Sequence, residues 1–307
     1  MERGRPPRPA GDGLRRIGPY QLITRLDPDG LGPSLVTERR FVARSADGER
    51  TVLICAPLAG VDAERFLVEA QAARGFGGPW VLPVAEVSPS AAAPWYATPY
   101  LPVLPLPVAL AVHGGPLPEH TVRALGTALA HTLAAAHAEG VTHAGLSPAA
   151  VLVAWDGPRL TCFGAVRAAG PDGEGRVGRP GLEPGSLSPE AAAGARPRPA
   201  GDIHGLGAVL AYAATGHTVP DRAELPSSLA PLISRCLSRD AAARPSAAEL
   251  LHGLPPASSA PSATVLDSAA SLLTPGWLPG RVAAALASQS AQVLATEFRV
   301  PDTASRT

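Results

Sequence analysis

The sequence predicts an α+β fold of two lobes, in which a small antiparallel β lobe with one helix precedes a larger, mainly α-helical lobe. Three observations predict it. Short β-branched runs separated by turn residues fill most of the first third of the chain, and one stretch of helix formers interrupts them. A proline-rich segment follows. Beyond it, apolar residues recur at three- and four-residue intervals, which is the period of a buried helix face.

The first lobe is expected to begin with strands. Alternating and β-branched residues from Tyr20 to Ala56 predict an antiparallel meander, with the turn sequence Asp27-Pro28-Asp29-Gly30 inside it. Good helix formers from Asp62 to Arg74 predict one helix, which a Gly-Pro break ends. Strands are expected again around Trp80 to Val87 and Trp95 to Leu101.

The second lobe is expected to be mainly helical. Three prolines, at 102, 105 and 107, indicate a stiff extended connection, so the lobe boundary is placed near 101–107. A long helix is predicted from Pro118 to Ala138, because its apolar residues keep the helical period and Gly140 follows as a stop. Two further helices are predicted around Ile203 to Ala213 and Leu229 to Leu237.

Four segments are expected to lie outside the main domain of residues 17–254. Residues 1–16 are rich in Arg, Pro and Gly and are expected to be a disordered tail. A Pro/Ser/Ala-rich linker is expected over 255–276, an amphipathic helix over 277–299, and a short tail over 300–307.

Composition excludes several classes of partner. The 26 basic and 26 acidic residues balance, so no net charge favours nucleic acid or an anionic membrane. No run approaches the ~20 apolar residues of a membrane span. Three cysteines are too few for a disulfide framework, and a reducing cytoplasm is expected. All 26 basic residues are arginine, so the chain contains no lysine.

Seven short motifs occur in an order and at spacings that chance does not readily give. They are Ile17-Gly18-Pro19-Tyr20, Pro94-Trp95-Tyr96-Ala97-Thr98, Val141-Thr142-His143, Pro158-Arg159-Leu160-Thr161-Cys162-Phe163-Gly164, Ser188-Pro189-Glu190, Gly201-Asp202-Ile203 and Ala243-Arg244-Pro245. On these residues the chain resembles bacterial serine/threonine protein kinases of the actinobacterial type from Ile17 to Leu254. The resemblance implies a bilobal protein-kinase-like fold with a nucleotide cleft between the lobes.

The resemblance also assigns residues to that cleft, and most of them depart from the family pattern. The assigned positions are Asp27, Asp29, Gly30, Gly32, Cys55, Glu69, Thr98, Leu101 and Cys162. Two aspartates stand where the phosphate-binding loop has glycines, so like charges would face a triphosphate. Cys55 stands at the phosphate-binding lysine, and Glu69 at its glutamate partner.

The catalytic positions are replaced as well. The base, the lysine and the metal-binding asparagine of the family fall at Gly145, Ser147 and Ala150, and Cys162 replaces the metal-binding aspartate. None of these side chains offers the hard anionic oxygen that Mg²⁺ prefers. The resemblance implies that Glu190, Asp202 and Arg244 remain as structural residues.

These replacements predict a pseudokinase that is no enzyme. We expect a protein-binding, scaffolding or regulatory module in signalling, with no catalytic residues, no metal site, and ATP/Mg²⁺ binding that is absent or very weak. The partners are expected to be proteins, whose identity and stoichiometry the sequence leaves open.

Two alternatives stay open. An atypical serine/threonine kinase using ATP would need a replacement carboxylate, for which Asp156, Glu174 and Glu183 are candidates. A thiol-based redox or soft-metal sensor would use Cys55 and Cys162, which face each other across the cleft in the resembled fold, with His143 as a remote further ligand.

Overall fold

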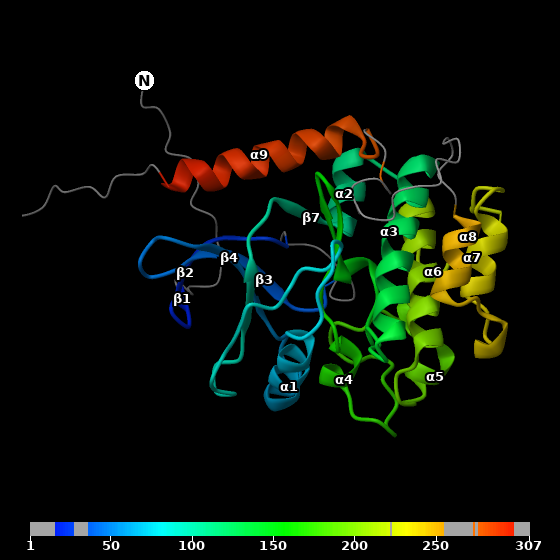
Figure 1. Ribbon diagram of the computed structural model, residues 1–307, viewed down its shortest axis with the longest axis horizontal. Helices are drawn as coiled ribbons and strands as arrows, with labels where there is room; N and C mark the ends of the chain where they lie inside the picture. The colour runs from blue at the N-terminus through cyan, green and yellow to red at the C-terminus, as the bar shows by residue number, and fades with distance from the viewer. Residues whose placement is uncertain (1–15, 28–35, 222, 255–272, 274–275, 298–307) are drawn as a thin grey trace, which may run out of the picture.

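The computed structural model describes residues 16–27, 36–221, 223–254, 273 and 276–297. They form the two lobes expected from the sequence, with the β lobe on the left of Figure 1 and the helical lobe on the right. The α+β, protein-kinase-like fold is therefore confirmed. Arg16, the last residue of the expected N-terminal tail, belongs to the first strand. The rest of the expected tails and most of the expected linker lie outside the described residues.

The small lobe is a six-stranded antiparallel sheet with strand order β1-β2-β3-β4-β6-β5. Helix α1 (Ala63–Ala73) packs beside it and begins at Asp62, whose carboxylate accepts a hydrogen bond from the backbone N–H of Arg65 at 2.9 Å. The strands are β1 (Arg16–Ile17), β2 (Tyr20–Arg25), β3 (Arg39–Arg44), β4 (Thr51–Ala56), β5 (Glu86–Val87) and β6 (Tyr96–Pro99).

The strand expected around Trp80 to Val87 is shorter than predicted. Only Glu86–Val87 pairs as a strand, because Pro83 interrupts the segment and cannot donate a ladder hydrogen bond. The preceding residues instead attach to the other lobe: the N–H of Leu82 donates to the carbonyl of Leu160 at 3.0 Å, and the N–H of Leu160 donates to the carbonyl of Trp80 at 2.7 Å.

The large lobe surrounds helix α3 (Glu119–Ala138). Its predicted apolar face is buried, with Val122, Leu125, Leu129 and Leu133 each at most 1% exposed. Three antiparallel strands, β7 (Val103–Pro105), β8 (Val151–Ala154) and β9 (Gly157–Leu160), line the cleft side of this lobe. The other helices are α2 (Leu106–His113), α4 (Ala165–Ala169), α5 (Pro189–Ala192), α6 (Pro199–Thr215), α7 (Ala230–Cys236) and α8 (Ala247–Gly253).

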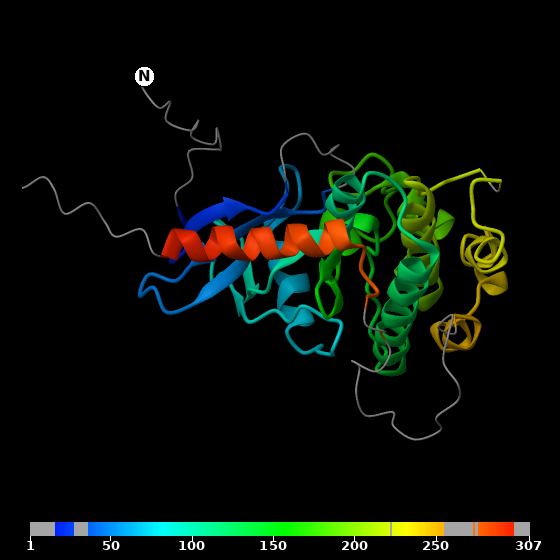
Figure 2. The same ribbon diagram turned by 90° about the horizontal axis from the view of Figure 1, so that it is seen from above.

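Helix α9 (Gly280–Glu297) comes from the region where the sequence predicts a helix over 277–299. It runs across one side of both lobes, from α2 to the sheet, as both views show (Figures 1 and 2). None of the helices in the described part of the chain combines the length and hydropathy that crossing a bilayer demands.

Candidate functional site

Asp27 lies at the start of the segment that the resemblance assigns to the phosphate-binding loop, and it presents no free carboxylate to the cleft. Asp27 is 0% exposed and forms a buried ion pair with Arg40, whose Nε donates to Oδ2 of Asp27 at 3.0 Å. The expectation treated Asp27 as a free charge, whereas Arg40 balances that charge inside the protein. Its effect on a bound phosphate stays a prediction. Asp29, Gly30 and Gly32 lie outside the described residues.

Arg40 links the two lobes. Its Nη1 donates to the backbone carbonyl of Ala149 at 2.8 Å, so a β3 side chain contacts the catalytic-loop segment of the helical lobe. Burial lowers the pKa of Arg40, but the charge and hydrogen bonds of Asp27 more than offset this and raise it. The guanidinium therefore stays charged, and its hydrogen bonds join β3 both to Asp27 and to the helical lobe.

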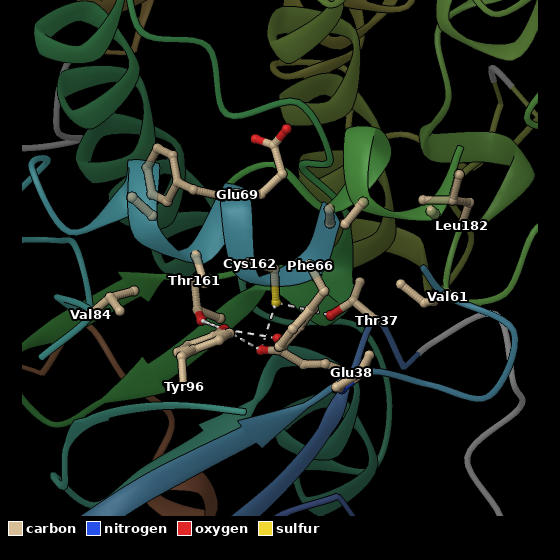
Figure 3. A pocket seen from close by; sticks show the side chains of 18 of the residues that line it. Thr37, Glu38, Val61, Phe66, Glu69, Val84, Tyr96, Thr161, Cys162 and Leu182 are labelled. Carbon is tan, nitrogen blue, oxygen red and sulfur yellow. Dashed lines mark hydrogen bonds between the residues drawn. The ribbon is translucent and has the colours of Figure 1, made fainter. Parts of the chain in front are cut away.

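A buried polar cluster occupies the back of the cleft, and its central residue was not predicted. Glu38, 3% exposed, accepts hydrogen bonds from the Tyr96 hydroxyl at 2.7 Å and from the Cys162 thiol at 3.0 Å (Figure 3). The hydroxyl of Thr37 lies 2.9 Å from the same thiol. Burial raises the pKa of Glu38 although the charge of Arg40 opposes it, which favours the neutral carboxylic acid.

The two cleft cysteines are buried and free. Burial raises the pKa of both Cys55, on β4, and Cys162, so neither thiol is a reactive thiolate. His143 is already bonded through Nε2 to the carbonyl of Thr161 at 2.8 Å. Among the described residues no group of three or more His, Cys, Asp or Glu could hold a metal ion. The thiol-sensor alternative therefore gains no support.

The other cleft residues from the sequence analysis lie around this cluster. Thr98 is buried in β6, and its hydroxyl has no hydrogen-bond partner among the described residues. Leu101 packs against the apolar cluster that contains Cys55. Glu69, on α1, is half-buried and lies against Gly164, and burial raises its pKa although Arg167 opposes the shift.

A small cavity lies between α1, the Cys162 segment and β6, with Glu38, Glu69 and Cys162 in its lining (Figure 3). Its volume of about 40 Å³ is enough for a few water molecules.

The catalytic-loop positions are tightly packed. Gly145 has a φ of +149°, and a Cβ added there would lie 2.8 Å from Cβ of Ala165, so the backbone requires glycine. Ala150 is 0% exposed. The Ser147 hydroxyl is buried and has no hydrogen-bond partner among the described residues.

Asp202 holds this loop in place. Its carboxylate accepts hydrogen bonds from the backbone N–H of His143 at 2.8 Å and of Ala144 at 2.9 Å, and lies 2.9 Å from Nε2 of His137. Ala144 and Cys162 are non-glycine residues with a left-handed backbone, at φ of 51° and 64°. Such backbone strain persists only where surrounding contacts impose it.

Glu190 and Arg244 join α5 to the region before α8. Nη1 and Nη2 of Arg244 donate to the two carboxylate oxygens of Glu190 at 2.5 and 2.9 Å. This two-point geometry is the strong form of an arginine–carboxylate pair. Arg244 also donates to the backbone carbonyl of Ser238 at 2.8 Å, so the pair organises several loops at once.

This pair should make stability depend on pH under acidic conditions. Burial alone would raise the pKa of Glu190, but the bonds from Arg244 outweigh it and lower the pKa from 4.5 to about 2. The stabilisation is therefore present above pH 4.5 and lost as the pH falls towards 2. We expect the unfolding midpoint of the wild type to fall more steeply over this window than that of Glu190→Gln. Parallel curves would contradict the expectation.

The three candidate replacement carboxylates have different surroundings. Asp156 pairs with Arg159 at 2.6 Å and Glu174 pairs with Arg179 at 2.9 Å, and both carboxylates are largely exposed. Glu183 accepts hydrogen bonds from two hydroxyls and lines a cavity that Gly145 and Ser147 also line. Only Glu183 of the three therefore lies beside the catalytic loop.

The fold and these loops define a protein-kinase-like domain: a twisted sheet with one helix, an extended connection, and a helical lobe whose loop is held by a buried aspartate. No family model matches the chain. The chain is, however, similar to several curated proteins. It is 36% identical over 263 residues to "Probable serine/threonine-protein kinase PkwA" of Thermomonospora curvata and 34% identical over 264 residues to "Serine/threonine-protein kinase AfsK" of Streptomyces coelicolor.

These matches cover 78% and 79% of the chain, which spans 34% and 32% of those two relatives. The chain is thus homologous to actinobacterial serine/threonine protein kinases. The expectation that it is not an enzyme is contradicted, because the named homologues are kinases, which are enzymes. Replaced residues at catalytic positions do not demonstrate inactivity.

Proposed function

We propose that this chain serves in signalling as a regulatory, protein-binding module of the kinase type, whose cleft binds ATP and Mg²⁺ weakly. The observation that carries the proposal is the Glu38 cluster. Cys162 stands where the resemblance puts the metal-binding aspartate, and the nearby Glu38 carboxyl group is buried and accepts hydrogen bonds from Cys162 and Tyr96. Burial raises the pKa of Glu38 and so favours its neutral form, which is a poor Mg²⁺ ligand. A thiol is a poor Mg²⁺ ligand, and the chain contains no lysine to neutralise a triphosphate.

The structural contacts that match the family pattern also support this proposal. Asp202 and the pair of Glu190 with Arg244 maintain the loops on the face of the helical lobe, independently of any phosphate chemistry. A rigid surface of this kind suits partner recognition, because binding then costs little ordering entropy. We place the protein in the cytoplasm, where its three free, buried cysteines would stay reduced.

Thermal unfolding of the full chain with ATP and Mg²⁺ tests the cleft. If the dissociation constant is about 1 mM or weaker, about 1 mM ATP stabilises the protein by at most about 0.4 kcal/mol, a shift of about 1 °C. Mg²⁺ alone is the control. A saturable shift of several degrees would overturn the weak-binding part of the proposal.

The protein-binding part of the proposal has its own test. It predicts that the tagged chain co-purifies from its native cell with one protein in a fixed ratio. Recovery of the chain without such a protein would contradict it.

A second candidate function is ATP-dependent phosphotransfer through non-standard residues. Homology to kinases favours it, as does Glu183, whose carboxylate lines the cavity beside Gly145 and Ser147. It predicts phosphate incorporation into protein that Glu183→Gln abolishes and that the matched variant Glu174→Gln, altered at an exposed ion pair, retains. Equal incorporation by both variants would exclude Glu183 as the base.

A further inference from the structure

Helix α9 is attached to the helical lobe at its N-terminal end. Trp277 is 5% exposed, its indole N–H donates to the carbonyl of Trp155 at 3.0 Å, and its own carbonyl accepts from the Thr121 hydroxyl at 2.6 Å. Val282 and Leu286, 0% and 2% exposed, belong to the core of this lobe. The first half of the helix therefore packs on α2, and the Trp277 segment that precedes it is bonded to α3.

The middle of α9 binds the connection between the lobes. The side-chain amide of Gln289 accepts a hydrogen bond from the backbone N–H of Val103 at 2.9 Å and donates one to the Val103 carbonyl at 2.8 Å. Val103 begins β7, the edge strand of its sheet. The glutamine thus supplies both hydrogen bonds that a neighbouring strand would give at that residue.

The last part of α9 packs into a buried cluster that includes residues assigned to the cleft. Val293 is 4% exposed and lies in the same buried cluster as Leu26 and Cys55, against which Leu101 packs. Cys55 and Leu101 are residues that the resemblance assigns to the nucleotide cleft. The next residue, Leu294, is 51% exposed, so burial is confined to one face of the helix.

Positions 282, 286, 289 and 293 follow the spacing i, i+4, i+7 and i+11, the pattern by which a helix fills a groove. We propose that α2, β7 and the Cys55 cluster form a helix-binding groove, and that α9 fills it in cis and closes the mouth of the interlobe cleft. The groove takes an amphipathic helix that places an amide against Val103 and an apolar side chain in the buried cluster that contains Cys55. The proposal is independent of the function proposed above.

The three free cysteines provide the test, because Cys55 belongs to the same buried cluster as Val293, whereas Cys236 lies in the core of the helical lobe. The full chain is treated with N-ethylmaleimide, and modification of each cysteine is followed by peptide mass spectrometry. Val293→Asp is expected to speed modification of Cys55 about tenfold or more while Cys236 stays at the wild-type rate, since opening is local. Leu294→Asp, which alters an exposed position one residue further, is the matched control and should leave Cys55 unchanged.

A rate for Cys55 in Val293→Asp within about twofold of the wild type would overturn the proposal, since an aspartate cannot stay buried there unpaired. If Val293→Asp unfolds, Cys236 accelerates in step with Cys55, and Gln289→Ala then decides. That variant removes only the two bonds to Val103, and we expect a several-fold rise at Cys55 with Cys236 constant. Equal rates at Cys55 in Gln289→Ala and the wild type would then refute the closure.

Discussion

Replacing Arg40 by alanine is expected to lower the free energy of unfolding by about 3–5 kcal/mol, because the change leaves a buried charge without its partner. Asp27 is 0% exposed and receives two hydrogen bonds from the Arg40 guanidinium. The Ala149 carbonyl loses a donor in the same substitution. Denaturant unfolding measures the effect as a lower midpoint at constant m-value.

Two comparisons separate this effect from the loss of any arginine. Arg50→Ala removes one partner of an exposed pair with Glu86, whose side chains are 58% and 36% exposed, and should leave the free energy of unfolding nearly unchanged. Arg40→Met combined with Asp27→Leu should restore much of the stability, since no unpaired charge stays buried. Equal losses of unfolding free energy in Arg40→Ala and Arg50→Ala would show that the buried pair with Asp27 stabilises the protein no more than an exposed pair does.

Elements defined by local sequence were predictable. The period of apolar residues placed α3, and Asp62 marked the start of α1, because helix faces and N-caps are encoded within a few residues. The segment from Trp80 to Val87 was predicted less well. Its residues favour strands, but Pro83 and the contacts with Leu160 decide its pairing, and those contacts join distant parts of the chain.

The cleft contacts were harder to predict, because they depend on pairs far apart in the sequence. Asp27 was expected to face a triphosphate, but its carboxylate is buried and pairs with Arg40. Glu38 and Cys162 are separated by 124 positions, and Gln289 and Val103 by 186. One signal was available: in a chain without lysine, a buried carboxylate can pair only with arginine or histidine, or become neutral.

Whether the chain is an enzyme was predicted less well than its fold. Residue replacements at positions such as Cys55 and Gly145 describe which groups are present, whereas activity depends on what the whole site can do with them. The kinase homologues therefore corrected the expectation that the chain is no enzyme. The structural role of Asp202 was easier to predict from the sequence. The loop needs an acceptor for its backbone N–H groups whether or not the residues that perform chemistry are kept.

Replacing Asp202 by alanine is expected to cost about 2–6 kcal/mol of unfolding free energy, since two buried backbone N–H groups would each lose an acceptor at about 1–3 kcal/mol. These are the amides of His143 and Ala144. The left-handed backbone of Ala144 would also lose the contact that imposes it, so the loop should relax. Denaturant unfolding measures the loss, and hydrogen exchange should show the two amides losing protection before the amides of α3.

Two variants sharpen this prediction. Asp202→Asn keeps one acceptor oxygen and should lose less stability than Asp202→Ala, because only part of the hydrogen bonding disappears. Asp156→Ala, at an exposed pair with Arg159, should cost about 0–1 kcal/mol. If the His143 and Ala144 amides keep their wild-type protection in Asp202→Ala, other contacts hold the loop, and its geometry would then have to come from the packing of Gly145 against Ala165.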